Sequence, residues 1–164
     1  MKIAFLDRDG TINKDYPDAN WTEIMTPEFY PDTFSALRMI QKKGYEIIII
    51  TNQYLIGEGY ISQAQYDAFT VQFLNAISEA HITVLDIFYC PHSRIENCRC
   101  CKPAPGMLEE ALQKYPEIVL GKSFFAGDTD TDKQLAAHFA LPFYLVNNAG
   151  KGAGVSLLQV AELV

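Results

Sequence analysis

Two aspartates separated by one residue follow an apolar segment near the start of the chain, in the run Asp7-Arg8-Asp9-Gly10-Thr11. A carboxylate can attack phosphorus, so Asp7 is a candidate nucleophile for phosphoryl transfer. Asp9 can protonate the leaving oxygen and then activate a water molecule. In an extended backbone Arg8 points away from the side that the two carboxylates share. Taken alone the run could be a polar turn, so its interpretation depends on what lies at neighbouring strand ends.

Three further segments carry polar groups that suit the same chemistry: Thr51-Asn52-Gln53, Lys102, and Gly127-Asp128 with Asp132. The hydroxyl of Thr51 and the ammonium of Lys102 would neutralise charge on the transferring phosphoryl oxygens. Magnesium takes one or two carboxylates together with phosphate and water, which Asp7 and Asp128 can supply. Each segment alone could be a helix cap, a surface lysine or an acidic first turn of a helix. Their order along the chain, each near an expected strand end, predicts one phosphoryl-transfer site.

All the cysteines lie between residues 90 and 101, and a histidine lies among them. The spacing of Cys90, His92, Cys98 and Cys100 is that of three thiolates and one imidazole around a tetrahedral, structural zinc ion. The alternative is a tight loop of buried, reduced cysteines. We expect zinc, with a supporting role and no part in the chemistry.

The elements that must position these residues are short apolar segments alternating with longer amphipathic ones. The expected strands cover residues 2–6, 45–50, 84–89, 123–126 and 143–146. The expected helices follow Pro31-Asp32, open at a Ser62/Gln65 capping box, and cover residues 108–115, 133–139 and 155–164, with Gly44 ending the first. This order predicts an α/β, Rossmann-like fold of three layers, a parallel sheet with helices on both faces. Sites in such folds lie at the carboxyl ends of the strands.

Length, composition and charge narrow the class of protein. A chain of 164 residues is the size of one domain, so we expect residues 1–164 to form a single domain with a zinc loop at 90–101. The net charge of −7, from 13 basic and 20 acidic residues, argues against nucleic acid as a partner. The longest apolar run, Ile47 to Ile50, is far too short for a membrane span. With no hydrophobic leader, we expect a cytoplasmic monomer that acts on a small phosphorylated metabolite.

These motifs resemble those of the haloacid-dehalogenase superfamily of phosphohydrolases. More narrowly, Phe5 to Asn13, Thr51-Asn52-Gln53, Cys90-Pro91-His92 and Lys102 to Met107 resemble the branch of heptose-bisphosphate and histidinol-phosphate phosphatases. The resemblance covers about residues 1–150 and implies a fold without a large cap domain.

The resemblance also implies roles for individual residues. It makes Asp7 the nucleophile, Asp9 the acid and base, and Thr51 and Lys102 the phosphate stabilisers. It places magnesium on Asp7, the backbone carbonyl of Asp9, and Asp128, and zinc in the cysteine loop. The expected substrate contacts are Arg8, Asn52 and Lys133, with Asp15 and Asp18 at sugar hydroxyls.

One departure bears on the substrate. The family usually has arginine directly before the motif lysine, whereas this chain has Cys101, so a second phosphate would be held less well. The short interval from His92 to Cys98 favours the histidinol-phosphate branch, and the segments 59–66 and 103–107 favour the heptose branch. We expect a heptose 1,7-bisphosphate phosphatase first and a histidinol-phosphate phosphatase second. A phosphometabolite-binding protein without turnover is the remaining alternative.

Overall fold

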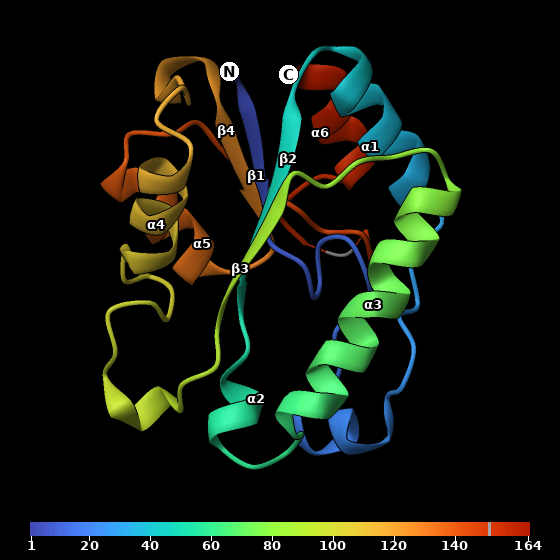
Figure 1. Ribbon diagram of the computed structural model, residues 1–164. Coiled ribbons are helices and arrows are strands. Elements are labelled where there is room, and N and C mark those ends of the chain that lie inside the picture. The colour runs from blue at the N-terminus through green and yellow to red at the C-terminus, as the bar shows by residue number, and fades with distance from the viewer. Residues whose placement is uncertain (151) are drawn as a thin grey trace.

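Five parallel strands form one sheet in the order β3-β2-β1-β4-β5 in a computed structural model that describes residues 1–150 and 152–164 (Figure 1). The strands are β1 (Ile3–Leu6), β2 (Glu46–Asn52), β3 (Asp86–Cys90), β4 (Phe124–Gly127) and β5 (Phe143–Leu145). All four pairings are parallel, as the alternation of strands and helices predicts. Because β1 is central, the residues that follow it lie between the ends of β2 and β4.

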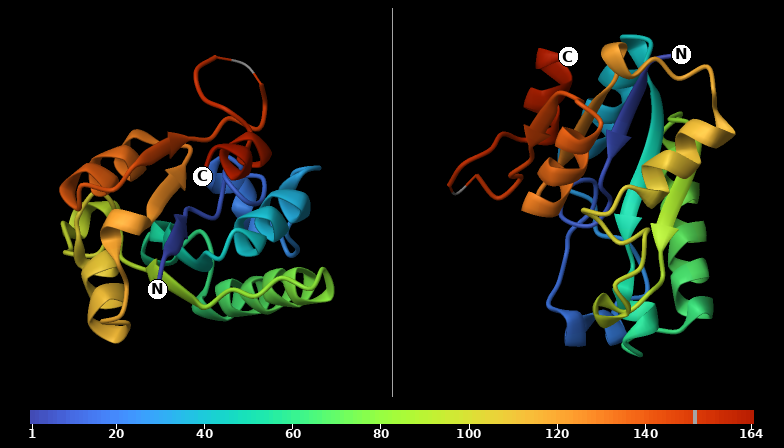
Figure 2. Two further views of the ribbon diagram at one scale, coloured as in Figure 1. Left: turned by 90° about the horizontal axis from the view of Figure 1, so that it is seen from above. Right: turned by 90° about the vertical axis from the view of Figure 1, so that its left-hand side faces the viewer.

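Helices cover both faces of this sheet, which confirms the three-layer prediction (Figures 1 and 2). The helices are α1 (Thr33–Lys42), α2 (Tyr54–Gly57), α3 (Gln63–Glu79), α4 (Gly106–Lys114), α5 (Asp130–His138) and α6 (Leu157–Leu163). Helices α1, α3 and α6 pack on one face, and α4 and α5 pack on the other. Three short 3-10 helices cover residues Asp18–Glu23, Arg94–Glu96 and Leu120–Lys122. The described residues form no large cap, and the long connections are those after β1 and after β3.

The central strands are apolar on both faces because each face meets its own core. In β1, Ala4 and Leu6 point into the core under α1, α3 and α6, whereas Ile3 and Phe5 point into the core under α4 and α5. In β2 the isoleucines at 47–50 alternate between the two cores in the same way. Successive side chains of a strand point to opposite faces, so a strand covered by two helix layers reads as a continuous apolar run.

Local signals set several helix ends. Ser62 and Gln65 form the expected capping box at the start of α3, and Gly44 follows α1 with a φ of +84°. Helix α5 begins at Asp130, three residues before the predicted start, because Thr129 and Asp132 form a capping box that was not foreseen. This earlier start places a buried acid, Asp132, in the first turn of α5.

Strands β2 and β3 both reach further than predicted. Thr51 and Asn52 belong to β2 and pair with Tyr89 and Cys90 of β3. Cys90 therefore lies beside Asn52 at the edge of the sheet where the polar segments gather. None of the helices in the described part of the chain has the length and hydropathy of a membrane span.

Candidate active site and cysteine cluster

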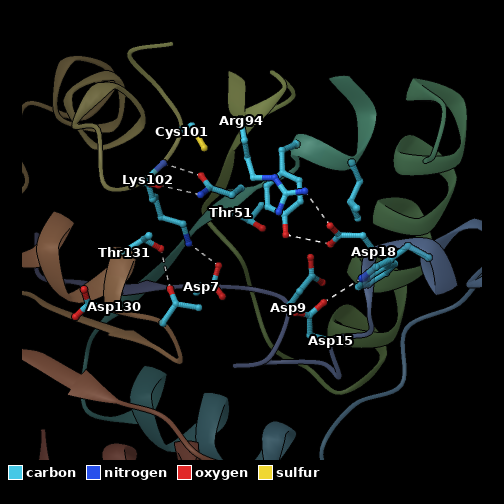
Figure 3. A pocket seen from close by; sticks show the side chains of 15 residues that line it. Asp7, Asp9, Asp15, Asp18, Thr51, Arg94, Cys101, Lys102, Asp130 and Thr131 are labelled. Atoms are coloured by element: carbon cyan, nitrogen blue, oxygen red, sulfur yellow. Dashed lines mark hydrogen bonds and ion pairs between the residues drawn. The ribbon is translucent and has the colours of Figure 1, made fainter. Parts of the chain in front are cut away.

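The polar segments that the sequence singles out meet at the carboxyl edge of the sheet. Asp7 follows β1, Thr51 ends β2, and Asp128 follows β4. Lys102 reaches the same place from the loop between β3 and α4. A cavity of about 340 Å³ is lined by Asp7, Asp9, Thr51 and Lys102, among others (Figure 3). Asp128 is not among the residues that line it. The predicted convergence of these distant segments is therefore present.

Lys102 holds the centre of this arrangement. Its Nζ donates to Asp7 Oδ1 at 2.6 Å, to Asp132 Oδ1 at 2.7 Å and to the carbonyl of Ile50 at 2.8 Å. The three N–H groups of the ammonium are thus all used, and the side chain is only 3% exposed. Burial opposes the charge, but Asp7 and Asp132 outweigh it and raise the pKa of Lys102. The role of Asp132 as a partner of Lys102 is not apparent from the sequence.

Three carboxylates crowd together beside Lys102. Oxygen atoms of Asp7, Asp128 and Asp132 all lie within 4.8 Å of one another. Burial raises the pKa of Asp7 well above its ordinary value; Lys102 opposes this rise, and the other two acids add to it. Burial likewise raises the pKa of Asp128. The site therefore concentrates negative charge in a place with little water to screen it.

Glycines make room for two of these acids. A Cβ on Gly10 would lie 2.2 Å from Asp128 Oδ2, and a Cβ on Gly127 would lie 2.4 Å from Asp132 Oδ2. Gly10 also has a φ of +90°, which side-chain-bearing residues rarely adopt. Both positions thus require glycine for the carboxylates to approach the backbone.

The carboxylate of Asp9 is fixed by four donors from three residues. Arg8 donates from Nε and Nη2 at 2.9 Å each, Asn13 donates from Nδ2 at 2.9 Å, and Gln53 donates from Nε2 at 2.8 Å. Gln53 Nε2 also donates to Thr51 Oγ1 at 3.0 Å. This arrangement joins the ends of β1 and β2 and fixes where the Asp9 oxygens point.

Arg8 does not contact the cavity, so the expectation that it binds substrate needs correction. Its side chain is 1% exposed, and its guanidinium lies over the rings of Tyr66 and Phe69. Because Arg8 pairs with Asp9 and packs on these two rings, it supports Asp9 from beneath the site. A buried Arg–carboxylate fork of this kind orients its partner.

The other two predicted substrate contacts differ from each other. Asn52 lines the cavity and holds Lys102: it accepts from the Lys102 amide at 2.7 Å and donates to its carbonyl at 3.2 Å. Lys133 is exposed on α5 and is not among the residues that line the cavity. The residues of this segment that do line it are Thr129, Asp130 and Thr131. The structure therefore does not place Lys133 at this cavity, and the part of the segment that reaches the cavity lies at the start of α5 and just before it.

The half of the cavity beyond Asp9 is built mainly by the loop after β1 and by α2. Trp21 is 4% exposed, and its Nε1 donates to Asp15 Oδ1 at 3.0 Å. Tyr54 donates from its hydroxyl to Asp18 at 3.2 Å. Arg94 reaches this half from the cysteine loop (Figure 3). Sequence reasoning missed Tyr54 and Arg94, because neither belongs to a motif.

The cysteine loop brings its four predicted ligands together. Cys90, His92, Cys98 and Cys100 each offer a ligand atom, and these atoms all lie within 4.8 Å of one another. His92 Nδ1 is 3.0 Å from Cys100 Sγ, and Cys98 Sγ is 3.4 Å from Cys90 Sγ. Burial opposes ionisation of Cys98, but the donated N–H of Cys101 and the neighbouring groups lower its pKa to about 7. Burial raises the pKa of Cys90 and of Cys100, so Cys98 is the thiol of the three that ionises most readily.

This fold and site define a phosphatase of the haloacid-dehalogenase superfamily. Three features support this assignment: the parallel sheet, the two aspartates after β1, and the lysine and acids that face them. The chain belongs to the polynucleotide kinase 3 phosphatase family, whose sequence model matches residues 2–146.

Individual relatives point to one branch of the superfamily. A Thermoplasma acidophilum protein, named probable D-glycero-D-manno-heptose-1,7-bisphosphate 7-phosphatase, is 40% identical over 90% of this chain and 91% of its own length. A Photorhabdus laumondii D-glycero-alpha-D-manno-heptose-1,7-bisphosphate 7-phosphatase is 39% identical over 87% of this chain and 80% of its own length. A solved structure of a B. bronchiseptica D,D-heptose 1,7-bisphosphate phosphatase, complexed with magnesium and phosphate, has a TM-score of 0.84 at 28% identity. It covers 99% of this chain and 97% of its own.

Proposed function

We propose that this chain is a magnesium-dependent phosphomonoesterase that acts on a small phosphorylated sugar through an aspartyl-phosphate on Asp7. The observation that carries the proposal is the buried ammonium of Lys102, which bonds Asp7 at 2.6 Å within a cluster that also contains Asp128. A carboxylate held by a buried lysine ammonium at the floor of a cavity suits nucleophilic attack on phosphorus.

Each half of the reaction assigns a role to a particular side chain. An oxygen of Asp7 attacks phosphorus while the bond to the leaving oxygen breaks, and protonated Asp9 gives its proton to that oxygen. Asp9 then takes a proton from a water molecule that attacks the aspartyl-phosphate, and Asp7 is released with inorganic phosphate. Thr51 and Lys102 offset charge on the phosphoryl oxygens. Arg8 and Gln53 keep Asp9 aimed at the leaving oxygen.

The donor set around Asp7 fits magnesium. Its ligand atoms would be oxygens of Asp7 and Asp128, with the carbonyl of Asp9, and magnesium prefers oxygen ligands. The space that Gly10 leaves for Asp128 and the raised pKa values of both acids fit a site that needs a cation. When bound, magnesium would neutralise the charge of the phosphoryl group and of the acids.

The cysteine cluster fits structural zinc. Three thiolates and an imidazole suit tetrahedral zinc, for which a Zn–S bond of about 2.3 Å implies ligand separations somewhat under 4 Å. The separations between the ligand atoms of Cys90, His92, Cys98 and Cys100 run from 2.8 to 3.5 Å, so the four atoms lie slightly closer together than around a bound zinc ion. Zinc would hold the loop that ends at Lys102.

Heptose 1,7-bisphosphate is the first substrate to assay, since the most similar relatives are named for it. Histidinol phosphate is the second, because Asp15 and Asp18 in the cavity suit an ammonium group. A polynucleotide 3′-phosphate, to which the family description points, suits the net charge of −7 poorly.

The test is phosphate release from heptose 1,7-bisphosphate, histidinol phosphate, a 3′-phosphorylated oligonucleotide and a generic aryl phosphate, with magnesium or with a chelator. Asp7→Asn should lose about a thousandfold or more of kcat, because the amide is a poor nucleophile. Asp67→Asn is the matched control, because this acid is exposed on α3 and its carboxylate accepts a hydrogen bond from Gln63. Release without metal, or full activity of Asp7→Asn, would contradict the proposal.

A further inference from the structure

Two basic side chains, Lys102 and Arg94, line the cavity in the part of the chain that the structure describes. Lys102 is committed at the reaction end, where its three N–H groups bond to Asp7, Asp132 and the Ile50 carbonyl. Of the two, only Arg94 can donate to a part of the substrate that lies beyond the reacting phosphate.

The guanidinium of Arg94 has donors to spare. A guanidinium carries five N–H groups, and Arg94 uses three of them. Its Nε and Nη2 donate to Glu58 at 2.8 and 2.6 Å, and Nη2 also donates to Asp18 at 2.9 Å. Nη1 bonds to none of the residues that the structure describes, so both of its N–H groups are available to a ligand.

These contacts hold the guanidinium in place before any ligand binds. Glu58 accepts along one edge of it, and the hydrogen bonds from Arg94 lower the pKa of Glu58 and so keep that carboxylate ionised. The guanidinium also lies over the ring of Tyr54, 4.0 Å from the ring centre. A donor fixed in this way loses little side-chain entropy when it binds an anion.

There is open space beside this arginine. Arg94, Cys101 and Lys102 line both the active-site cavity and a neighbouring hollow of about 500 Å³, so Arg94 lies where the two adjoin. Figure 3 shows it reaching into the cavity beside Asp18. Its side chain is 50% exposed, so water screens the repulsion that Glu58 and Asp18 would exert on an anion bound at Nη1.

A phosphate is the group that best suits the two free N–H groups. Its oxygens accept charge-assisted hydrogen bonds from a guanidinium. Sugar hydroxyls have acceptors elsewhere, because the carboxylates of Asp15 and Asp18 line the same cavity. Heptose 1,7-bisphosphate, the first substrate proposed above, carries a phosphate at each end of the sugar, and only one of them occupies the reaction end.

We propose that Nη1 of Arg94 binds the second phosphate of a sugar bisphosphate, the one that is not cleaved, and thereby makes the enzyme prefer bisphosphates to monophosphates. This inference rests on the proposed function. It assigns substrate specificity to a residue of the cysteine loop, in place of an arginine directly before Lys102.

Arg94→Gln tests the inference on two esters that differ only in the second phosphate, heptose 1,7-bisphosphate and heptose 7-phosphate. We expect the wild-type chain to prefer the bisphosphate. The variant should lower the ratio of bisphosphate to monophosphate kcat/KM by about tenfold or more, mainly through KM, because a charge-assisted hydrogen bond is lost. An equal fall for both esters would show that Arg94 contacts the sugar or only holds the loop, and would overturn the inference. A wild-type chain without the preference would overturn it too.

Arg99→Gln is the matched control. Arg99 lies in the same loop and pairs with Glu109 through the same two nitrogen atoms, Nε and Nη2, but it does not line the cavity. The ratio for this variant should equal that of the wild-type chain. A fall of the same size in both arginine variants would contradict the inference, because it would show a general effect of charge in the loop.

Failure of the proposed function gives a different result. If the wild-type chain hydrolyses neither ester, the proposed function fails, and calorimetry with magnesium then measures binding of both esters to the wild-type chain and to Arg94→Gln. Bisphosphate binding that weakens about tenfold in the variant, with a smaller change for the monophosphate, would support the inference. Equal changes for the two esters, or no binding of either, would overturn it.

Discussion

Carboxylates packed against glycine backbone define the site at the scale of single residues. Asp128 occupies the space beside Gly10 that a Cβ would fill, and Asp132 does the same at Gly127. Asp132 also caps α5 through Thr129 and bonds Lys102, so one buried acid serves the helix and the site together. Adding a methyl group at either glycine should therefore displace the neighbouring carboxylate, and this should affect activity more than it affects stability.

The first prediction concerns Gly10. In Gly10→Ala the new methyl group would meet Asp128 Oδ2 at 2.2 Å on a backbone with φ of +90°. We expect the magnesium concentration for half-maximal activity to rise roughly 10- to 100-fold, because a proposed ligand is displaced. Magnesium titration of phosphatase activity measures this.

Gly121→Ala is the matched control for that substitution. Gly121 lies in the 3-10 helix before β4, and a Cβ there would meet nothing within 4 Å. Its magnesium dependence should equal that of the wild-type chain. Equal titration curves for all three proteins would show that Asp128 is not positioned by Gly10.

At the scale of elements, the loop from β3 to α4 is a part of the site with few buried side chains of its own. It places Lys102 and Arg94 in the cavity, yet its aliphatic residue Ile95 is 92% exposed. The cysteines of this loop pack against the core under α4 and α5, and we expect the cluster that they form with His92 to fix the shape of the rest. A metal that closes such a loop stabilises it directly.

The second prediction separates the two cysteine roles in this loop. Cys98→Ser should lose bound zinc and lower Tm by at least about 5 °C, since loss of a structural metal removes folding free energy. It should also lower kcat, because Lys102 loses its support. Zinc analysis, thermal unfolding and a phosphatase assay measure the three effects.

Cys101→Ser serves as the comparison, because Cys101 lies next to the cluster but is not among its four predicted ligands. It should keep zinc and a Tm close to that of the wild-type chain. Loss of zinc in this variant and not in Cys98→Ser would assign the ligand to Cys101.

At the scale of the whole molecule, two separate cores hold the sheet from opposite sides. Phe73 of α3 is fully buried in the core that also contains α1 and α6, and its ring centre lies 5.6 Å from that of Phe29. Phe73 does not line the cavity. This core therefore bears on stability without touching the reacting groups.

The third prediction tests that separation. Phe73→Ala should lower the free energy of unfolding by about 3–5 kcal/mol, because it leaves a cavity in a packed core. Val71 lies on the same helix but is 57% exposed. Val71→Ala should therefore change the free energy of unfolding by less than about 0.5 kcal/mol. Urea unfolding measures both, and kcat at low temperature should stay near the wild-type value in each.

The sequence by itself determined the fold class, the edge of the sheet where the site lies, and the four residues that form the cysteine–histidine cluster. Apolar periodicity depends on neighbours within a few residues, and parallel strands bring their ends to one edge whatever their order. Asp7, Asp9, Thr51, Lys102 and Asp128 were identified in this way. The monomeric state and cytoplasmic location stay predictions.

Tertiary structure alone decided which side chains face the cavity. Arg8 turned out to be buried beneath Asp9, Lys133 to point outward, and Arg94 to enter from a loop without any motif. These positions depend on contacts between segments tens of residues apart, such as Arg94 with Asp18 and Arg8 with Phe69. No local pattern encodes such contacts, because they are selected by the packing and pairing of the folded chain as a whole.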